Sequence, residues 1–167
     1  LQYRAVDQDL ERYKPLKTAT LGGPTALAPD LVKRMQKDPK LSNYVAIAQE
    51  EAKKVGIDPN MYANQLWQES RFNPRAVSPA GARGIAQMMP DKVGKFGLQS
   101  SDDFYDAEKS IRAGARMMAG LTGKYGDQRM ALVAYNGGGR AIDFVEKSLG
   151  RQKVSFEEWH DYMSDRR

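Results

Sequence analysis

Residues that typically start and stop helices recur along the chain from residue 41 onward, and they constrain its fold more than any other feature. Asp58 followed by Pro59 is a typical helix start, because the aspartate can accept a first-turn N–H and proline has no N–H to leave unpaired. Gly56 and Gly150 follow helically spaced apolar residues and are typical helix stops. No segment alternates apolar and polar residues as a strand would. The sequence therefore predicts an all-α domain of six or seven short helices.

Each expected helix lies between such signals. Ser42, Asp106 and Asp127 are the expected N-caps of three of them, and Ser155 with Glu158 has the spacing of a capping box. The predicted helical segments are 42–56, 58–70, 84–97, 106–126, 127–138, 139–150 and 155–163.

Residues 1–40 differ from this pattern because prolines and glycines interrupt every helical period. We interpret them as an N-terminal arm or linker with short helical pieces at 9–13 and 29–36. Residues 41–167 are the predicted folded domain.

The composition excludes several kinds of site. The chain has no cysteine and one histidine, so disulfide frameworks, thiolate zinc sites, cysteine nucleophiles and Ser-His triads lack their parts. His160 lies in the polar stretch EEWHDYM, where we expect it at the surface. Five of the eight methionines are expected to fill the core rather than bind a cofactor: Met88, Met89, Met117, Met118 and Met130.

The charge pattern limits the kinds of partner that this chain is expected to bind. The net charge is +5 and the pI about 9.4, but basic and acidic residues are interspersed, which argues against a specific nucleic-acid partner. A modest positive field suits a polyanionic partner such as a cell-wall polymer. No apolar run reaches the roughly 18–20 residues of a transmembrane segment, and no signal peptide opens the sequence, which starts at Leu1.

Glu69 is the candidate catalytic residue. On a helix, Glu69 shares one side with Tyr62 and Leu66, so its carboxyl is expected to face the core or a cleft. Burial and the negative end of the helix dipole both favour the protonated form, which a proton donor to a leaving group needs. The alternative is a purely structural ion pair with one of three nearby arginines, Arg71, Arg75 or Arg83.

Two further stretches suit a binding groove beside this acid. The loop NPRAVSPAGARG is rich in turn-forming residues and is followed by Gln87 and Met89, a polar and an apolar lining expected at the start of the next helix. Far along the chain, AYNGGG places Tyr135 and Asn136 at a helix end, where a hydroxyl and an amide can orient a carboxyl or a sugar N-acetyl group.

Taken in order, these stretches resemble the catalytic domain of soluble-type lytic transglycosylases, which is related to goose-type lysozyme. ESRFNPRAVSPAGARGIAQMMP is similar to the first motif of that family, SIRAGARMM to the second, AYNGG to the third and, more loosely, VSFEEWHDYM to the fourth. The resemblance runs from about residue 41 to 163 and implies a lysozyme-like helical domain. Ser110 and Met117 depart from the second motif, which usually has an asparagine and an aromatic residue there.

The resemblance also implies roles for individual residues. Glu69 matches the single catalytic acid/base, and Tyr135 matches the tyrosine that orients its carboxyl. The matched groove positions are Ser78, Gln87 and Met89, with Glu158 as a less certain one.

The implied reaction cleaves the β-1,4 bond between N-acetylmuramic acid and N-acetylglucosamine in peptidoglycan and forms 1,6-anhydromuramic acid, without metal or cofactor. The expected partners are glycan strands in the periplasm or cell wall, and possible further ones are virion or envelope proteins, since such domains also occur in phage virions. One alternative is a lysozyme-type hydrolase that uses a second carboxylate, for which Asp91, Asp102 and Asp103 are candidates. Another is a weakly active structural or delivery module.

Overall fold

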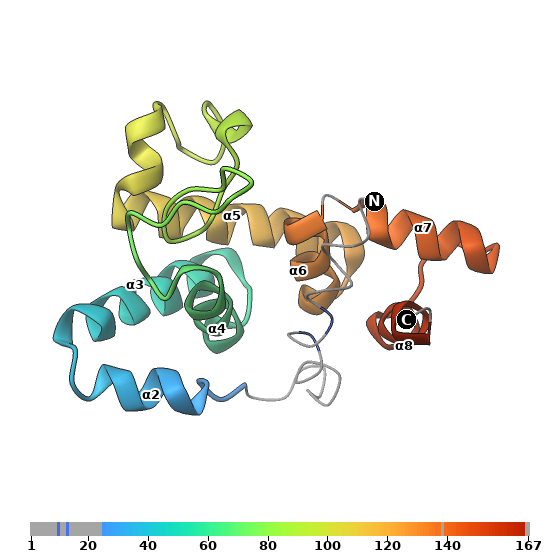
Figure 1. Cartoon of the computed structure of the whole chain (residues 1–167), viewed down its shortest axis with the longest axis horizontal. Helices are drawn as coiled ribbons and strands as arrows, with labels where there is room; N and C mark the ends of the chain where they lie inside the picture. Colours follow the sequence, from blue (N-terminus) through green and yellow to red (C-terminus); the bar gives the residue numbers. More distant parts are fainter. Residues whose placement is uncertain (1–9, 11–12, 14–24, 138, 166–167) are drawn as a thin grey trace. The chain divides into compact units, whose positions relative to one another are not determined.

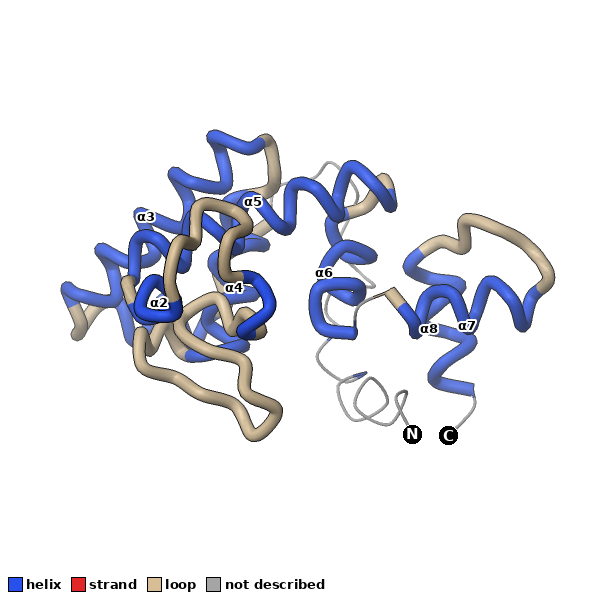
Figure 2. Tube along the Cα trace, turned by 90° about the horizontal axis from the view of Figure 1, so that it is seen from above, coloured by secondary structure: helices blue, strands red, loops and turns tan. Residues whose placement is uncertain are grey.

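The computed structural model describes residues 10, 13, 25–137 and 139–165 of the chain. In this part of the chain the regular structure is helical, with seven α-helices, two 3-10 helices and no named strand (Figure 1 and Figure 2). The all-α prediction is therefore confirmed. The elements in order are α2 (Pro29–Met35), α3 (Pro39–Val55), α4 (Pro59–Ser70), η1 (Pro90–Lys92), η2 (Ser101–Tyr105), α5 (Ala107–Tyr125), α6 (Gln128–Gly137), α7 (Arg140–Leu149) and α8 (Phe156–Asp165).

Residues 25–119 form one compact unit, in which α2 packs on α3 and α3 packs on α4 (Figure 1). Helix α2 confirms the helical piece predicted at 29–36, and its Leu31 is fully buried. The Tyr62 hydroxyl donates a hydrogen bond of 2.6 Å to the Ile111 carbonyl oxygen and so ties α4 to α5. This unit carries Glu69 and the loop that follows it.

Residues 120–165, with Leu10 and Tyr13, belong to the second unit, in which α7 packs on both α6 and α8. Trp159 is fully buried there, with its ring centroid 5.6 Å from that of Tyr13. Its indole N–H donates to the Ala141 carbonyl oxygen at 3.3 Å. Of the helical piece predicted at 9–13, the structure describes Leu10 and Tyr13, both buried, and the other positions lie outside the described residues.

Most predicted helix ends are confirmed. The Asp58 side chain accepts the Met61 N–H at 2.8 Å, and Gly56 closes α3 with a left-handed φ of 79°. Ser155 and Glu158 form a reciprocal capping box, with N···O distances of 3.1 and 3.0 Å. The Asp106 carboxylate accepts the Lys109 N–H at the start of α5.

The prediction that Ser42 starts α3 is wrong. The helix begins at Pro39, and its N-cap is Asp38, whose carboxylate accepts the Leu41 N–H at 3.1 Å. An aspartate directly before a proline is the stronger start signal, as at the next helix. Ser42 instead donates its hydroxyl to the Met35 carbonyl oxygen at the end of α2.

The expected surface position of His160 is also wrong. His160 is buried, with Nε2 3.4 Å from the Leu10 carbonyl oxygen. Phe156, Trp159, His160 and Met163 recur at helical spacing and together form the buried side of α8. The acidic neighbours that made the stretch look polar occupy the other positions of that helix.

The methionines divide between core and surface. Met88, Met118 and Met130 are buried, as predicted, and Met117 is half-buried. Met89 is 42% exposed, so it is not core filler. Within the described residues, no helix is both long and apolar enough to cross a bilayer, and no His, Asp and Glu side chains gather as a metal site would require.

Candidate active site

Glu69 lies in the last turn of α4, as predicted, and is half-buried. Leu66 and Tyr62, about one and two turns earlier on the same side of the helix, are both fully buried. The carboxyl therefore extends the inward side of α4 to the point where the helix ends. Arg71, one of its three possible structural partners, forms an ion pair with Asp30 instead, at 3.0 Å.

The chain leaves α4 in an unusual backbone conformation. Arg71 and Phe72 both adopt left-handed φ angles, 55° and 56°, which non-glycine residues seldom do. Phe72 is 3% exposed, so burial of its ring offsets the strain of the turn. The result is an abrupt reversal that starts the following loop directly beside Glu69.

That loop is an irregular segment held by isolated bridges, and the predicted helix does not start at residue 84. Isolated antiparallel bridges join Val77 to Arg83 and Arg83 to Met88, with a turn over 84–87. Helical spacing suggested a helix, but Gly84 has a φ of 76° and Gln87 one of 49°, which end any helical run. The first regular turn after it is η1, which begins at Pro90.

Gln87 holds this loop together. Its side-chain Nε2 donates to the carbonyl oxygens of Ala76 and Gly84, at 3.2 and 3.0 Å. Both amide hydrogens therefore brace the backbone, and Oε1 is the atom that Gln87 can offer to a ligand.

Ser70 fastens the loop to the end of α4. Its hydroxyl lies 2.7 Å from the Ile85 carbonyl oxygen and 3.2 Å from that of Leu66. The turn over 84–87 is thus anchored to the residue next to Glu69 in the chain. The Glu-Ser pair of the first motif therefore has a physical basis: Glu69 is the candidate acid, and Ser70 holds the turn over 84–87.

A second anchor comes from Ser110 on α5. This serine is 1% exposed, and its hydroxyl accepts the Ala86 N–H at 3.1 Å. At Gly84 the backbone approaches η2 so closely that an added Cβ would lie 1.8 Å from the Phe104 carbonyl oxygen. The sequence marks Gly84 as a turn former and Ser110 as a departure from the second motif, but no local signal in it indicates that the two residues lie close together.

We expect Ser110→Ala to lower the free energy of unfolding by about 1–3 kcal/mol, because the buried Ala86 N–H loses its hydrogen bond to the Ser110 hydroxyl. Urea unfolding monitored by circular dichroism measures the change. Ser148→Ala is the matched control, since its exposed hydroxyl donates to the Phe144 carbonyl oxygen of its own helix. Equal stability of the two variants would contradict the anchoring role of Ser110.

Four of the predicted site residues belong to the unit of residues 25–119. Glu69 lies in the last turn of α4, while Ser78, Gln87 and Met89 lie on the loop. Ser78 is half-buried and its hydroxyl accepts the Ala82 N–H at 3.0 Å, closing the tip of the loop. Met89 leaves its side chain in solvent, where an incoming ligand can cover it.

The other three belong to the second unit. Tyr135 is half-buried and Asn136 is exposed, both in the last turn of α6. The Asn136 amide donates to the Tyr13 hydroxyl at 2.8 Å. Glu158 uses one carboxylate oxygen for the Ser155 N–H and the other for Arg151, so a ligand there would have to compete with Arg151.

The candidate second carboxylates are engaged locally. Asp103 accepts the backbone N–H groups of Gln99 and Ser100 and pairs with Lys109, which together hold the pKa of Asp103 below its usual range. Asp91 is exposed, and its hydrogen bond from Lys92 lowers the pKa of its carboxyl. These contacts are those of structural, charged carboxylates.

Comparison with known proteins gives one family match, in which the model described as "Transglycosylase SLT domain" matches residues 46–155. The matched segment contains Glu69, the loop and Tyr135, and Glu158 lies beyond its end. No solved structure matches the chain significantly.

Several curated proteins are similar over part of the chain. A "Transglycosylase" of Enterobacteria phage PRD1 is 37% identical over 92 residues, which is 55% of this chain and 34% of that protein. "Peptidoglycan transglycosylase gp16" of Escherichia phage T7 is 35% identical over 102 residues, 58% of this chain and 8% of that protein. "Membrane-bound lytic murein transglycosylase F" of Shewanella pealeana is 31% identical over 134 residues, 76% of this chain and 27% of that protein. The chain thus spans a minor part of each of these relatives.

Proposed function

The chain belongs to the transglycosylase SLT domain family, and on this premise we propose that it is a peptidoglycan lytic transglycosylase. It cleaves the β-1,4 bond between N-acetylmuramic acid and N-acetylglucosamine and leaves 1,6-anhydromuramic acid at the new end. The observation that carries the proposal is the family match over 46–155, because it includes the candidate acid and its loop. The relatives' names support the same substrate.

Glu69 serves as both acid and base in this proposal. Its carboxyl proton passes to the glycosidic oxygen as the C1–O bond breaks, so that N-acetylglucosamine leaves with a free hydroxyl. The N-acetyl carbonyl oxygen of the muramic residue stabilises the positive charge at C1. The Glu69 carboxylate then takes the proton of the C6 hydroxyl as its oxygen bonds to C1, which closes the anhydro ring and restores the acid.

The surroundings of Glu69 support this role. The half-buried position above Leu66 and Tyr62, at the negative end of α4, favours a neutral carboxyl over a carboxylate. On the loop, Ser78, Gln87 and Met89 are the proposed sugar contacts. Tyr135, Asn136 and Glu158 are proposed contacts from the second unit, with Tyr135 orienting the acid.

The rival reaction is hydrolysis of the same bond, which normally needs a second carboxylate to activate water. Asp91 and Asp103 are charged and tied to neighbouring groups, and Asp102 is exposed on η2. These contacts favour the transglycosylase.

Mass spectrometry of digested peptidoglycan tests the proposal. We expect muropeptides with anhydromuramic ends, each lighter by one water than the corresponding hydrolysis product. Reducing muramic ends without anhydro ends would instead establish a hydrolase. Undigested sacculi would mean that the chain belongs to the family but lacks this activity.

We further propose action at the cell wall, in the periplasm, in the service of phage DNA entry, since two of the relatives are phage proteins. A local passage through the wall requires few cuts, so a weakly active module within a larger virion protein is the second candidate function. Specific activity separates the two, because an entry module needs far fewer turnovers than a general wall-degrading enzyme.

A further inference from the structure

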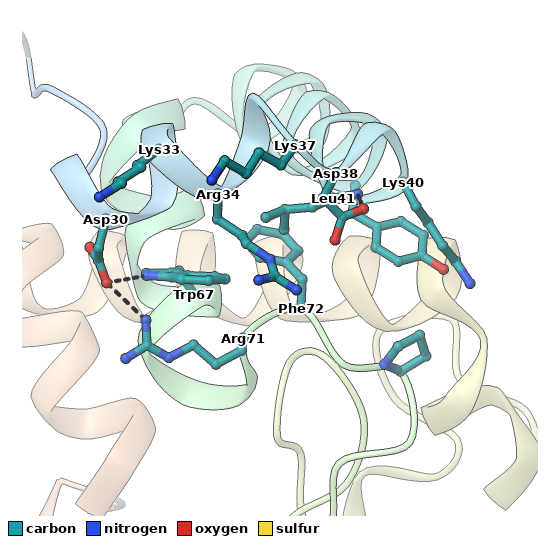
Figure 3. Close-up of a pocket in the computed structure, with 12 residues that line it drawn as sticks. Asp30, Lys33, Arg34, Lys37, Asp38, Lys40, Leu41, Trp67, Arg71 and Phe72 are labelled. Carbon is teal, nitrogen blue, oxygen red and sulfur yellow. Dashed lines mark hydrogen bonds and ion pairs between the residues drawn. The ribbon is translucent and has the colours of Figure 1, made fainter.

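A cleft lies on the unit of residues 25–119, and Glu69 is not among the residues that line it. It has a volume of about 650 Å³ and is formed by α2, the beginning of α3, the end of α4 and the residues that follow it (Figure 3). That volume falls within the range of roughly 300–1,000 Å³ typical of ligand sites. Trp67 lines it two residues before Glu69, so at about 100° per residue it projects from the opposite side of α4, and Arg71, the left-handed C-cap residue of that helix, lines it too.

The upper rim of this cleft is cationic. Lys33, Arg34, Lys37 and Lys40 all line it (Figure 3). Across the described part of the chain, the first three have no ion pair, and Lys40 lies over the Tyr44 ring at 5.8 Å. Four like charges that line one cleft repel one another, and a bound anion lowers that cost.

Three side chains contact one another along one wall of the cleft. The Asp30 carboxylate accepts the Trp67 indole N–H at 2.9 Å and pairs with Arg71 at 3.0 Å, while the Arg71 guanidinium stacks 4.4 Å from the Trp67 ring (Figure 3). These contacts keep the pKa of Asp30 below its ordinary value, through Trp67 first and Arg71 second. A wall ordered before binding loses little entropy when a ligand arrives.

The other surfaces distinguish between kinds of anion. Leu41 and Phe72 are buried, and with Tyr44 and Pro74 they give the cleft an apolar side. Asp38 places a carboxylate among the cations. A uniform phosphate polymer would meet repulsion from that carboxylate and gain nothing from the apolar side. A short peptide with carboxylates, methyl groups and an amine matches all three features.

We propose that this cleft binds the acidic peptide stem that muramic acid carries in peptidoglycan. The inference rests on the proposed function for its substrate. Because the cleft and Glu69 lie on opposite sides of α4, the stem it holds belongs to a strand other than the one being cut. The cleft then tethers the domain to the wall and raises the local concentration of glycan at the active site.

Binding to sacculi tests this directly. The Glu69→Gln variant is used so that no glycan is cleaved during the assay. It is sedimented with intact sacculi and, separately, with glycan strands from which an amidase has removed the stems. We expect tighter binding to intact sacculi. Adding Lys33→Gln, Arg34→Gln and Lys37→Gln should weaken that binding about ten-fold, the order expected for three exposed charge pairs, and leave binding to stripped strands unchanged.

The matched control removes the same three charges elsewhere, through Lys53→Gln, Lys95→Gln and Arg140→Gln at exposed positions outside the cleft. It should bind intact sacculi as the parent does. Equal weakening by both triple variants would overturn the proposal in favour of net charge. The proposal would also be overturned if the parent bound intact sacculi and stripped strands equally well. In that case, duplex DNA binding that is lost only in the cleft variant would assign the site to nucleic acid.

This result is independent of catalysis. If the variant prefers stem-bearing sacculi but the unsubstituted chain digests none, the proposed activity is wrong and the proposed role of the cleft stands. Digestion with anhydro products but no such preference would remove the cleft and keep the activity.

Discussion

Glu69→Gln should lower the rate of anhydromuropeptide release by about 10²–10⁴-fold, the contribution expected of a positioned acid/base. The amide has nearly the shape of the carboxyl but can neither give up a proton to the glycosidic oxygen nor take one from the C6 hydroxyl. The side chain is half-buried at a helix end, so the substitution should leave the fold unchanged. Release of soluble muropeptides from purified sacculi, followed by chromatography, measures the loss.

Two controls make this result specific. Glu50→Gln changes an exposed glutamate on α3 of the same unit and should keep full activity. Asp91→Asn should keep it too, because that carboxylate is exposed and paired with Lys92. Retained digestion by Glu69→Gln, with circular dichroism unchanged, would rule Glu69 out as the acid. Loss in Asp91→Asn would favour the hydrolase.

Gly84→Ala is expected to disrupt the loop beside Glu69. The new Cβ would lie 1.8 Å from the Phe104 carbonyl oxygen, so backbone must move, and the φ of 76° is costly for any residue with a Cβ. Together the displacement and the strain should lower the free energy of unfolding by about 2–5 kcal/mol. Urea unfolding measures this loss, and muropeptide release should fall with it because Gln87 and Ser78 lose their support.

Gly81→Ala separates the two causes. Gly81 has a similarly left-handed φ of 94°, but no atom lies within 4 Å of the position its Cβ would take. We expect it to cost only the conformational strain, about 1–2 kcal/mol. If both variants lost the same stability, the close approach of Gly84 to η2 would not be a constraint.

The helix ends are the part of this protein that the sequence by itself determined. Asp58, Asp106, Gly56 and Gly150 act where they were expected to act, because a cap bonds backbone groups only a few positions away. The side of α4 that Glu69 shares with Leu66 also followed from helical geometry alone. The family resemblance was visible for a related reason, since its motifs are short and ordered along the chain.

Tertiary structure decided the shape of the site. Helical spacing over 84–88 gave way to a turn, because Gly84 and Ala86 find their partners on η2 and α5, about 20 residues away in sequence. His160 is buried because its helix packs against Leu10, far along the chain.

The cationic cleft was hidden for the same reason. Its lysines lay in what the sequence presented as an arm, and Trp67 lay in a separate helix. Hydrogen bonds within one helical turn depend on residues that are close together in the sequence. Contacts between distant segments depend on which surfaces exclude water together, and only the folded chain brings those surfaces into register.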